Sequence, residues 1–493
     1  MKKKILYYII GVMLLVAAEA QGAGQYRYRL HLDGKPGSEL VAWSERAQER
    51  RMRLGIEADS LDLEISPVYI QQIEELGWTI VARSRWLNTV VVMGPEGLAI
   101  EDAQFEKLPF VRSVDLVTTR QRTTAPPRRA QEESSSTLDE DFTSPLRQVN
   151  AYEPLYEAGY RGAGMLVAIV DAGFSKVDQW DWLNKNVVGA RDMYSPISGT
   201  SKVYDADMHG TCCLSIMATP EEKGICGTAQ DAEYFLIRTE TDDSETELEE
   251  DMWVAGVELA DSLGADVISS SLGYYDFDTE YNNHTYDEFC QNSTIISQGA
   301  KIACGKGMLV CNAAGNERQT RWGQLIFPAD VEEVLTVGGV MQSGILASFS
   351  SPGFTVPYVK PDIVGRGTHC YIVTSWGGVS SDGRGTSYAT PLIAGLCTSL
   401  WSAVPELTPA QLRQVIRESA SQYNEPDSLY GYGIPDFGIA LAKARELHEM
   451  GVEEVIQDAP RKARGIYNVM GQRNIGRPRR GLFVEGGRVR FWR

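Results

Sequence analysis

Short apolar runs alternate with helical stretches from about residue 146 to residue 450, and this alternation constrains the fold more than any other feature. Five of the runs have the length and composition of buried strands: MLVAIVDAG, AEYFLIR, ADVISSSLG, GMLVCNAAGN and VLTVGGV. Helical stretches such as ELEEDMWVAGVELADSLG and STIISQGAKIACGKG lie between them. Strands joined through helices form βαβ units, so the pattern predicts an α/β fold with a parallel sheet covered by helices on both faces.

Residues 26–117 form a separate unit ahead of this domain. Three strand-like runs (YRYRLHL, WLNTVVVMG and VRSVDLV) alternate with two helical stretches, SPVYIQQIEELGW and GLAIEDAQFEKL. The β-α-β-α-β order favours a small α+β sandwich of ferredoxin-like type. The segment 118–145 is rich in Pro, Ser, Arg and acidic residues, which is typical of an exposed linker open to proteolysis.

Both ends of the chain have features of their own. Residues 1–20 combine three lysines, an apolar core and the sequence Ala18-Glu19-Ala20, which together predict an export signal peptide. A membrane anchor is the alternative, although the apolar run is short for a membrane-spanning helix. Residues 465–493 contain short strands between glycine-rich turns and predict a β-hairpin tail.

The net charge of the chain limits the classes of partner it can bind. The net charge is −19, which argues against nucleic acid as a partner. The stretch TETDDSETELEED, at residues 239–251, is the most acidic part of the main domain. We interpret it as a solvated loop and helix face in preference to a site for basic substrates.

The cysteine pattern leaves two alternatives open. The chain has eight cysteines, and an exported protein meets an oxidising environment, so disulfides are one expectation. Several cysteines lie in apolar runs, where a thiol packs as a small hydrophobe. The chain has no C-x-x-C pair, which disfavours a zinc site.

Three polar residues lie at the strand and helix ends where open α/β sheets hold their sites. Asp171 ends the run VAIVDAG, His209 precedes Gly-Thr before an apolar helix, and Ser387 lies in GTSYATPLIAGL. A serine hydroxyl needs an imidazole as base to become a nucleophile, and the imidazole needs a carboxylate to hold its tautomer. Each residue alone is common at a turn or helix cap, but the three together predict a nucleophilic relay.

The helix that starts near Ser387 accounts for two further residues. If it begins there, Pro391 falls among the first residues, whose N–H groups have no partner within the helix, so the missing N–H costs little. The positive end of the helix then lies beside Ser387, whose backbone N–H can donate to an oxyanion. Asn316, in NAAGNE, offers a side-chain amide as the second donor.

These motifs resemble those of the subtilisin-like serine proteases, the subtilase or peptidase S8 family. VAIVDAG resembles the family's aspartate motif, HGT its histidine motif, GTSYATP its serine motif and AAGNE its oxyanion motif, in the family's chain order Asp, His, Ser. The resemblance implies that Asp171 orients the imidazole of His209, which acts as general base and then as acid. Ser387 is then the nucleophile, and Asn316 the oxyanion donor.

The resemblance also implies which residues bind the substrate. SSSLG is similar to the segment on which the family pairs an extended peptide, here through Ser271, Leu272 and Gly273. A second segment is expected to wall the pocket for the residue before the cut; it consists of Ala313, Ala314 and Gly315.

The histidine motif departs from the family pattern. Cys212 and Cys213 follow HGT, where the family usually has His or Arg and then Val-Ala. We expect both to pack on the helix, with a thiol close enough to the base to respond to oxidation. Calcium sites are common in the family, but no ligand set matches here, so structural calcium stays unassigned. The relay itself needs no metal and no cofactor.

The implied function is a secreted serine endopeptidase made as a precursor. Residues 26–117 resemble an inhibitory prodomain, 118–145 its activation region and 146–450 the catalytic domain. Residues 465–493 resemble the sorting tails of proteins that Bacteroidetes-type bacteria export to the cell surface. The expected partners are polypeptide substrates, the prodomain and the export machinery.

Two other functions are considered. The first is a catalytically silent binding protein with the subtilase fold, a pseudoprotease. The second is a lipase or esterase of α/β-hydrolase type, which needs G-x-S-x-G and the order Ser, acid, His, neither of which is found around Ser387.

Overall fold

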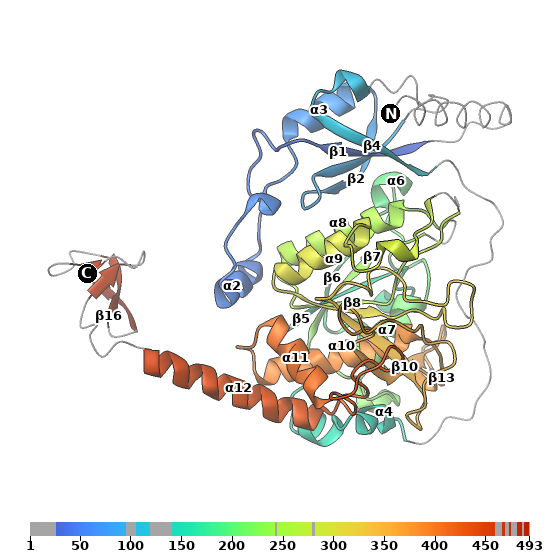
Figure 1. The fold of residues 1–493 in the computed structure, drawn as a ribbon, viewed down its shortest axis with the longest axis vertical. Helices are drawn as coiled ribbons and strands as arrows, with labels where there is room; N and C mark the ends of the chain where they lie inside the picture. Colours follow the sequence, from blue (N-terminus) through green and yellow to red (C-terminus); the bar gives the residue numbers. More distant parts are fainter. Residues whose placement is uncertain are drawn as a thin grey trace. The chain divides into compact units, whose positions relative to one another are not determined.

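The computed structural model describes residues 26–94, 105–118, 141–241, 244–278 and 282–458, together with four short strands between 466 and 492 (Figure 1). The chain divides into two compact units, Met1–Leu441 and Ala442–Arg493. The predicted signal peptide at 1–20 and nearly all of the predicted linker at 118–145 lie outside the described residues.

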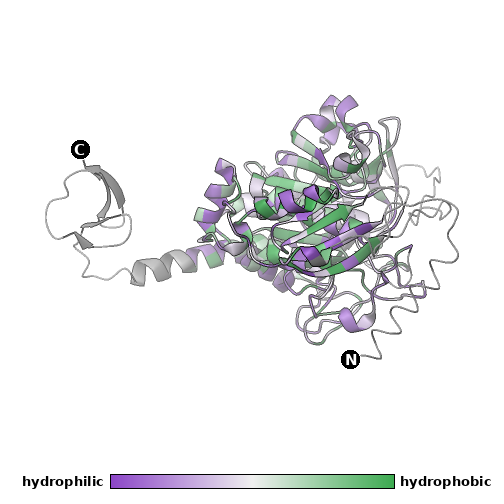
Figure 2. Ribbon diagram, turned by 90° about the horizontal axis from the view of Figure 1, so that it is seen from above, coloured by the Kyte–Doolittle hydropathy of each residue, from purple (hydrophilic) through white to green (hydrophobic). Residues whose placement is uncertain are grey.

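The first unit is built on a sheet of seven strands, all of them parallel, as the alternation predicts. Across the sheet the strands are β11 (Ile363–Arg366), β10 (Leu335–Val340), β9 (Leu309–Ala313), β8 (Val267–Ser270), β5 (Leu166–Asp171), β7 (Glu233–Arg238) and β6 (Val187–Asp192). Every residue of β5, β8, β9, β10 and β11 is buried, because helices cover both faces of the sheet. These strands are the hydrophobic centre of the molecule (Figure 2).

Two pairs of helices form the covering layers (Figure 1). On one face lie α8 (Leu248–Leu263) and α9 (Ile295–Gly305), and on the other lie α7 (His209–Ala218) and α10 (Thr386–Ala403). The other elements are α4 (Ser144–Gln148), α5 (Asp181–Asn184), α6 (Ser195–Ser198), α11 (Pro409–Ser419), α12 (Phe437–Asp458), β12 (Cys370–Val373) and β13 (Val379–Gly383). None of the helices in the described part of the chain is both long enough and apolar enough to cross a membrane.

The N-terminal subdomain, residues 26–118, has an antiparallel sheet of the ferredoxin-like kind. Its strands are β1 (Arg27–Leu32), β2 (Thr79–Ser84), β3 (Thr89–Met93) and β4 (Val111–Thr118), in the spatial order β2-β3-β1-β4. Helix α3 (Pro67–Glu75) follows the first strand. Most of the helix expected at residues 97–108 lies outside the described residues, and only the turn Phe105–Lys107 is seen.

The sequence interpretation missed two elements of this subdomain. Strand β2 has the sequence TIVARS, in which exposed and buried residues do not alternate regularly, so its strand pattern is weak. Helix α2 (Glu45–Leu54) has the sequence ERAQERRMRL and buries two arginines, so it has no apolar stripe by which a helix is recognised. Ion pairs with other elements hold α2 in place, where most helices are held by packing of an apolar face.

The N-terminal subdomain packs against α8, and this contact overturns the interpretation of 239–251 as a solvated face. Glu249, Glu250 and Asp251 are at most 3% exposed. Asp251 accepts two hydrogen bonds from Arg29 of β1, at 2.9 and 2.7 Å. Glu249 accepts from the backbone N–H groups of the preceding loop, at 3.0 and 3.2 Å. The acidic residues are therefore buried partners of the N-terminal subdomain and of the loop.

Helix α2 covers the C-terminal end of α8, where helix carbonyls have no partner within the helix. Ser44, the N-cap of α2, donates its N–H to Ser262 O at 3.0 Å and its hydroxyl to Leu263 O at 2.9 Å. Arg46 donates to Gly264 O at 3.1 Å, and Arg50 donates to the carbonyl of Asp261 at 3.3 Å. One helix thus caps another, and the cationic side chains lie at its negative end.

The second unit ends in a small antiparallel sheet. Its strands are β14 (Ile466–Asn468), β15 (Arg473–Asn474), β16 (Gly481–Glu485) and β17 (Arg488–Trp492). The last two form the predicted hairpin, and the sheet adds two strands that the prediction did not separate.

Candidate active site

Asp171 and His209 meet at the carboxyl end of β5. Asp171 is the last residue of the strand and is fully buried, and His209 is the first residue of α7. Asp171 Oδ1 lies 2.8 Å from His209 Nδ1 and also accepts from Ala172 N at 2.8 Å. The His209 side chain keeps 14% of its surface exposed. The pair therefore has a buried carboxylate that holds one ring nitrogen, while the ring remains accessible from outside.

Ser387 lies in the first turn of α10, next to this pair. The helix begins at Thr386, and Ser387 Oγ donates to Ser271 O at 3.4 Å. The ring of Tyr388 lies 5.7 Å from the ring of His209, centroid to centroid. The Cys213 thiol lies 4.0 Å from His209 Nδ1 and 3.4 Å from Ser387 O. Cys213 and Tyr388 thus connect the turn that carries Ser387 with the Asp171–His209 pair, although Asp171 and Ser387 are far apart in the chain.

The role expected for Pro391 needs a correction. Pro391 lies inside the helix, at its sixth residue, beyond the positions whose N–H groups lack a partner. Its missing N–H would have bonded the carbonyl of Ser387, four residues earlier. That carbonyl instead accepts from the Ser271 hydroxyl at 2.8 Å and from the Cys213 thiol at 3.4 Å. Two side chains from other elements replace the lost helix bond and tie down the turn that carries Ser387.

Asn316 lies in the loop after β9, beside the start of α10. Its side-chain oxygen accepts from Thr386 N at 3.0 Å and from Thr386 Oγ1 at 3.2 Å. Since the oxygen is held by two donors, the amide nitrogen is left to face outward from an exposed residue. The sequence interpretation missed the part of Thr386, for which its place in the GTS motif was the available signal. Asn316 therefore lies beside the turn that carries Ser387, fixed through Thr386.

The two segments expected to bind substrate flank Ser387. Ser271–Gly273 follows β8, and Ala313–Gly315 joins β9 to Asn316. The side chain of Asn312 ties the segments together by donating to Leu272 O at 3.0 Å. The segments therefore form two walls with Ser387 between their ends.

Cys212 and Cys213 pack inside α7, as expected. They are 7% and 0% exposed. Burial raises the pKa of the Cys212 thiol to about 12, and burial with the nearby Asp171 carboxylate raises that of Cys213 well above its usual value. Thiols that stay protonated are poor nucleophiles and poor metal ligands. The ligand atoms of Asp171, His209 and Cys213 lie within 4.8 Å of one another.

All eight cysteines, each within the described residues, are free thiols. Six of them are buried, as the thiol alternative expects, and the other two, Cys290 and Cys304, are half-buried.

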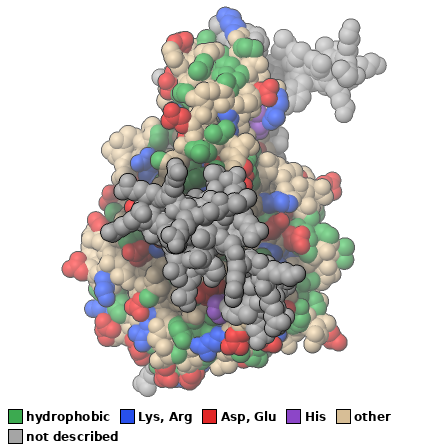
Figure 3. All heavy atoms as spheres, turned by 90° about the vertical axis from the view of Figure 1, so that its left-hand side faces the viewer, with side chains coloured by type: hydrophobic (Ala, Val, Ile, Leu, Met, Phe, Trp, Pro, Cys, Tyr) green, Lys and Arg blue, Asp and Glu red, His purple; other side chains and the backbone are tan. Residues whose placement is uncertain are grey.

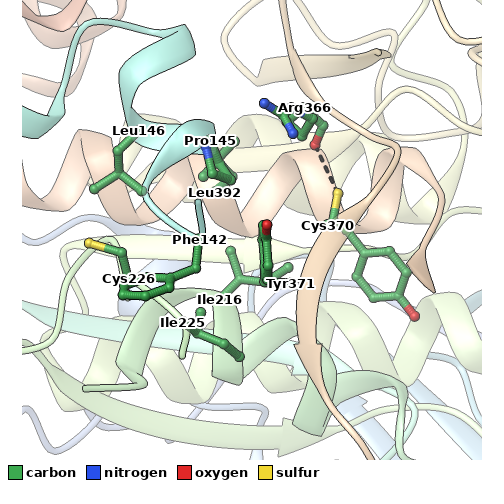
Figure 4. A pocket seen from close by; sticks show the side chains of 11 residues that line it. Phe142, Pro145, Leu146, Ile216, Ile225, Cys226, Arg366, Cys370, Tyr371 and Leu392 are labelled. Carbon is green, nitrogen blue, oxygen red and sulfur yellow. Dashed lines mark hydrogen bonds between the residues drawn. The ribbon is translucent and has the colours of Figure 1, made fainter. Parts of the chain in front are cut away.

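A small cavity lies between α4, α7, α10 and β12, lined mainly by apolar side chains (Figure 4). Its volume is about 20 Å³, and Cys370 donates to Arg366 O at 3.3 Å on one side of it. A space of this size holds a single water molecule and no peptide side chain. None of the residues of the predicted relay lines it.

Comparison with known protein families decides the affiliation of the chain. The model of the subtilase family, peptidase S8, matches residues 162–433, more than half of the 493 residues. The chain belongs to the subtilase family. The family resemblance and the α/β fold predicted from the sequence are thereby confirmed. A second model, the peptidase S8 propeptide domain of Bacteroidota, matches residues 35–135, so this subtilase carries a propeptide domain at its N-terminus.

Characterised relatives agree with this affiliation. Subtilisin E of Bacillus subtilis is 29% identical over 282 residues, which cover 57% of this chain and 66% of the relative. Subtilisin DY of Bacillus licheniformis is 29% identical over 277 residues, covering 56% of this chain and 89% of the relative. The chain thus spans just under two thirds of the length of subtilisin E.

A solved structure shares the fold. The epidermin leader peptide processing serine protease of Staphylococcus aureus is 17% identical, with a TM-score of 0.59, and the match covers 85% of this chain and 99% of that chain. At this level of identity the likeness concerns the fold alone.

Proposed function

We propose that the protein is a serine endopeptidase that is made as a precursor, exported by its signal peptide and active outside the cell or at its surface. The observation that carries the proposal is the contact of 2.8 Å between the buried Asp171 carboxylate and His209, beside the helix turn that holds Ser387. Membership of a peptidase family supports the same conclusion.

The proposed reaction is acyl transfer. His209 takes the proton of Ser387 Oγ, which attacks the peptide carbonyl, and Asp171 stabilises the imidazolium that forms. The negative oxygen of the tetrahedral intermediate accepts from Asn316 Nδ2 and from the backbone N–H of Ser387. His209 then returns the proton to the leaving amine, and a water molecule activated by the same ring hydrolyses the acyl-enzyme. This reaction needs no metal and no cofactor.

The N-terminal subdomain is proposed to hold the enzyme silent until the linker at 118–145 is cut. Its buried ion pairs with α8 support a tight contact in the precursor. The tail at 465–493 is proposed as a sorting signal for the cell surface. Structural calcium, which is common in the family, stays unassigned to residues of this chain.

A fluorophosphonate probe tests the enzyme against a silent binding protein. We expect the processed protein to be labelled once per chain and the Ser387→Ala variant to remain unlabelled. If the linker is cut by the enzyme itself, the Ser387→Ala variant also keeps its N-terminal subdomain, which intact mass measurement detects. A processed protein that binds peptides but takes no label would favour the pseudoprotease.

A further inference from the structure

We propose that Ile326 blocks the pocket next to Ser387, so that the enzyme cuts after small side chains such as alanine and rejects large ones. This inference rests on the proposed function and names the substrate class of the same site. Ile326 lies nine residues after the motif AAGNE but belongs to none of the four motifs, and nothing in its local pattern predicts a part in the site.

The position of the substrate carbonyl at Ser387 determines which pocket receives the side chain before the cut. The carbonyl carbon must contact Ser387 Oγ while its oxygen faces Asn316. A peptide that pairs with Ser271–Gly273 then directs the side chain before the cut into the space between the two walls. The depth of that space decides which residue is accepted.

The floor of this space is the segment Ile326–Phe327, which is bonded to both walls. Ile326 N donates to Ala314 O at 3.3 Å. Phe327 N donates to Tyr274 O at 3.1 Å, and Tyr274 N donates back to Phe327 O at 3.0 Å. The segment cannot recede without breaking its hydrogen bonds to Ala314 of one wall and to Tyr274, the residue that follows the other wall.

The side chain of Ile326 rises between the walls. A Cβ placed on Gly273 would lie 2.5 Å from Ile326 Cγ1, and one placed on Gly315 would lie 2.9 Å from Ile326 Cγ2. Both distances are shorter than real contacts, so Ile326 fills the space where larger wall residues would point. Gly315 has φ +104°, which also favours glycine.

Ile326 has little freedom to move aside. It is 8% exposed, and a β-branched side chain has few accessible rotamers. A methyl group can enter above it, whereas a phenyl ring or a branched aliphatic group would overlap it. The rim carries Tyr275 and Glu317, joined by a hydrogen bond of 2.7 Å, which narrows the outer opening further.

The test measures kcat/KM of the processed enzyme on tetrapeptide p-nitroanilides that differ only in the last residue, alanine or phenylalanine. We expect the wild type to prefer alanine by at least about tenfold. We expect Ile326→Gly to raise kcat/KM for the phenylalanine substrate about tenfold or more, with the alanine value changed by less than about threefold. Ile326→Ala should change each kcat/KM value in the same direction as Ile326→Gly does, but by a smaller factor. It serves as the second variant if Ile326→Gly folds poorly.

A matched control distinguishes the effect of a deeper pocket from the effect of removing any buried apolar side chain. Leu346 is also 8% exposed and packs with Val340 and Val364, outside the two walls. Leu346→Gly should leave the ratio of the two kcat/KM values unchanged. A wild type that is labelled at Ser387 and prefers phenylalanine overturns the role of Ile326 but leaves the proposed function intact. A protein that neither takes the label nor cuts any substrate overturns both.

Discussion

The carbonyl of Ser387 shows how a single residue, Pro391, changes what its neighbours must do. Proline removes the helix N–H that would normally reach this carbonyl. Because the turn is half-buried, an unpaired carbonyl there would cost about 1 kcal/mol or more. The hydroxyl of Ser271 and the thiol of Cys213 supply the replacement. Ser271 thus supports the turn as well as lying in a wall of the substrate site.

A double-mutant cycle tests this account. Ser271→Ala should lower the free energy of unfolding by about 1–2 kcal/mol, because the carbonyl loses its bond of 2.8 Å. In a Pro391→Ala background, where the helix N–H is restored, the same change should cost less than about 0.5 kcal/mol. All four proteins of the cycle carry Ser387→Ala and keep the N-terminal subdomain, and urea unfolding measures the free energy of unfolding of each. Equal costs in both backgrounds would show that Ser271 does not replace the helix bond.

At the scale of elements, the contact of α2 with α8 joins opposite charges that are almost completely buried. Arg51 bonds Asp62 within the N-terminal subdomain at 2.8 Å and Asp261 of α8 at 2.9 Å. Arg85 adds an ion pair with Glu258 at 3.2 Å. A buried charge that loses its partner is strongly destabilising, even where the intact pair contributes little.

Arg51→Ala should therefore lower the free energy of unfolding of the Ser387→Ala precursor by about 3–5 kcal/mol. The control is Arg83→Ala, whose side chain is 53% exposed and pairs with Glu74 at 3.9 Å; it should change stability by less than about 0.5 kcal/mol. Thermal and urea unfolding give the comparison. Similar effects of the two substitutions would mean that the buried network does not hold the subdomains together.

Elements with a strong pattern could be predicted from the sequence, and those held by tertiary contacts could not. The buried strands β5, β8 and β9 and the helices α8 and α9 follow apolar runs of the right length. Helix α2 escaped because its buried side chains are arginines, whose partners lie about 210 residues further along the chain.

The candidate site shows the same division. Asp171, His209, Ser387 and Asn316 lie at junctions that the motifs mark, so their approach could be expected. The position of Ile326 between Gly273 and Gly315 depends on three loops packing together, which no local pattern records. The expectation for Pro391 was wrong because the proline is the sixth residue of α10, and even counted from Ser387 it would be the fifth, beyond the four N–H groups that lack a partner.

At the scale of the whole molecule, we expect the stability of the precursor to depend on pH through the contact between the N-terminal subdomain and the main domain. Acidic and basic side chains are interspersed on the surface face shown in Figure 3. At the buried contact, burial raises the pKa of Glu247 to about 7, although the nearby Arg29 guanidinium opposes the rise. A carboxyl whose pKa is raised in the folded state costs stability as the pH rises from its unfolded value toward 7, and the full cost persists above that pH.

Glu247→Gln should remove this cost, since an amide oxygen can still accept the bond of 3.0 Å from Asn282. We expect the variant to be more stable than the Ser387→Ala parent by about 2–3 kcal/mol at pH 8 and by less than about 1 kcal/mol at pH 5. Urea unfolding at the two pH values measures the difference. A constant difference across this range would mean that Glu247 titrates normally in the precursor.

In the α2–α8 contact, the cations belong to the N-terminal subdomain and the facing anions belong to the main domain. Cutting the connection between them would leave two molecules that attract each other by complementary charge. While the contact is closed, dissolved salt screens these buried pairs only weakly. Once the two molecules have separated, salt weakens the long-range attraction that brings them together again, because the screening distance shortens from about 30 Å at 0.01 M to about 8 Å at 0.15 M. Salty surroundings would therefore slow the return to the latent state more than they would speed its loss.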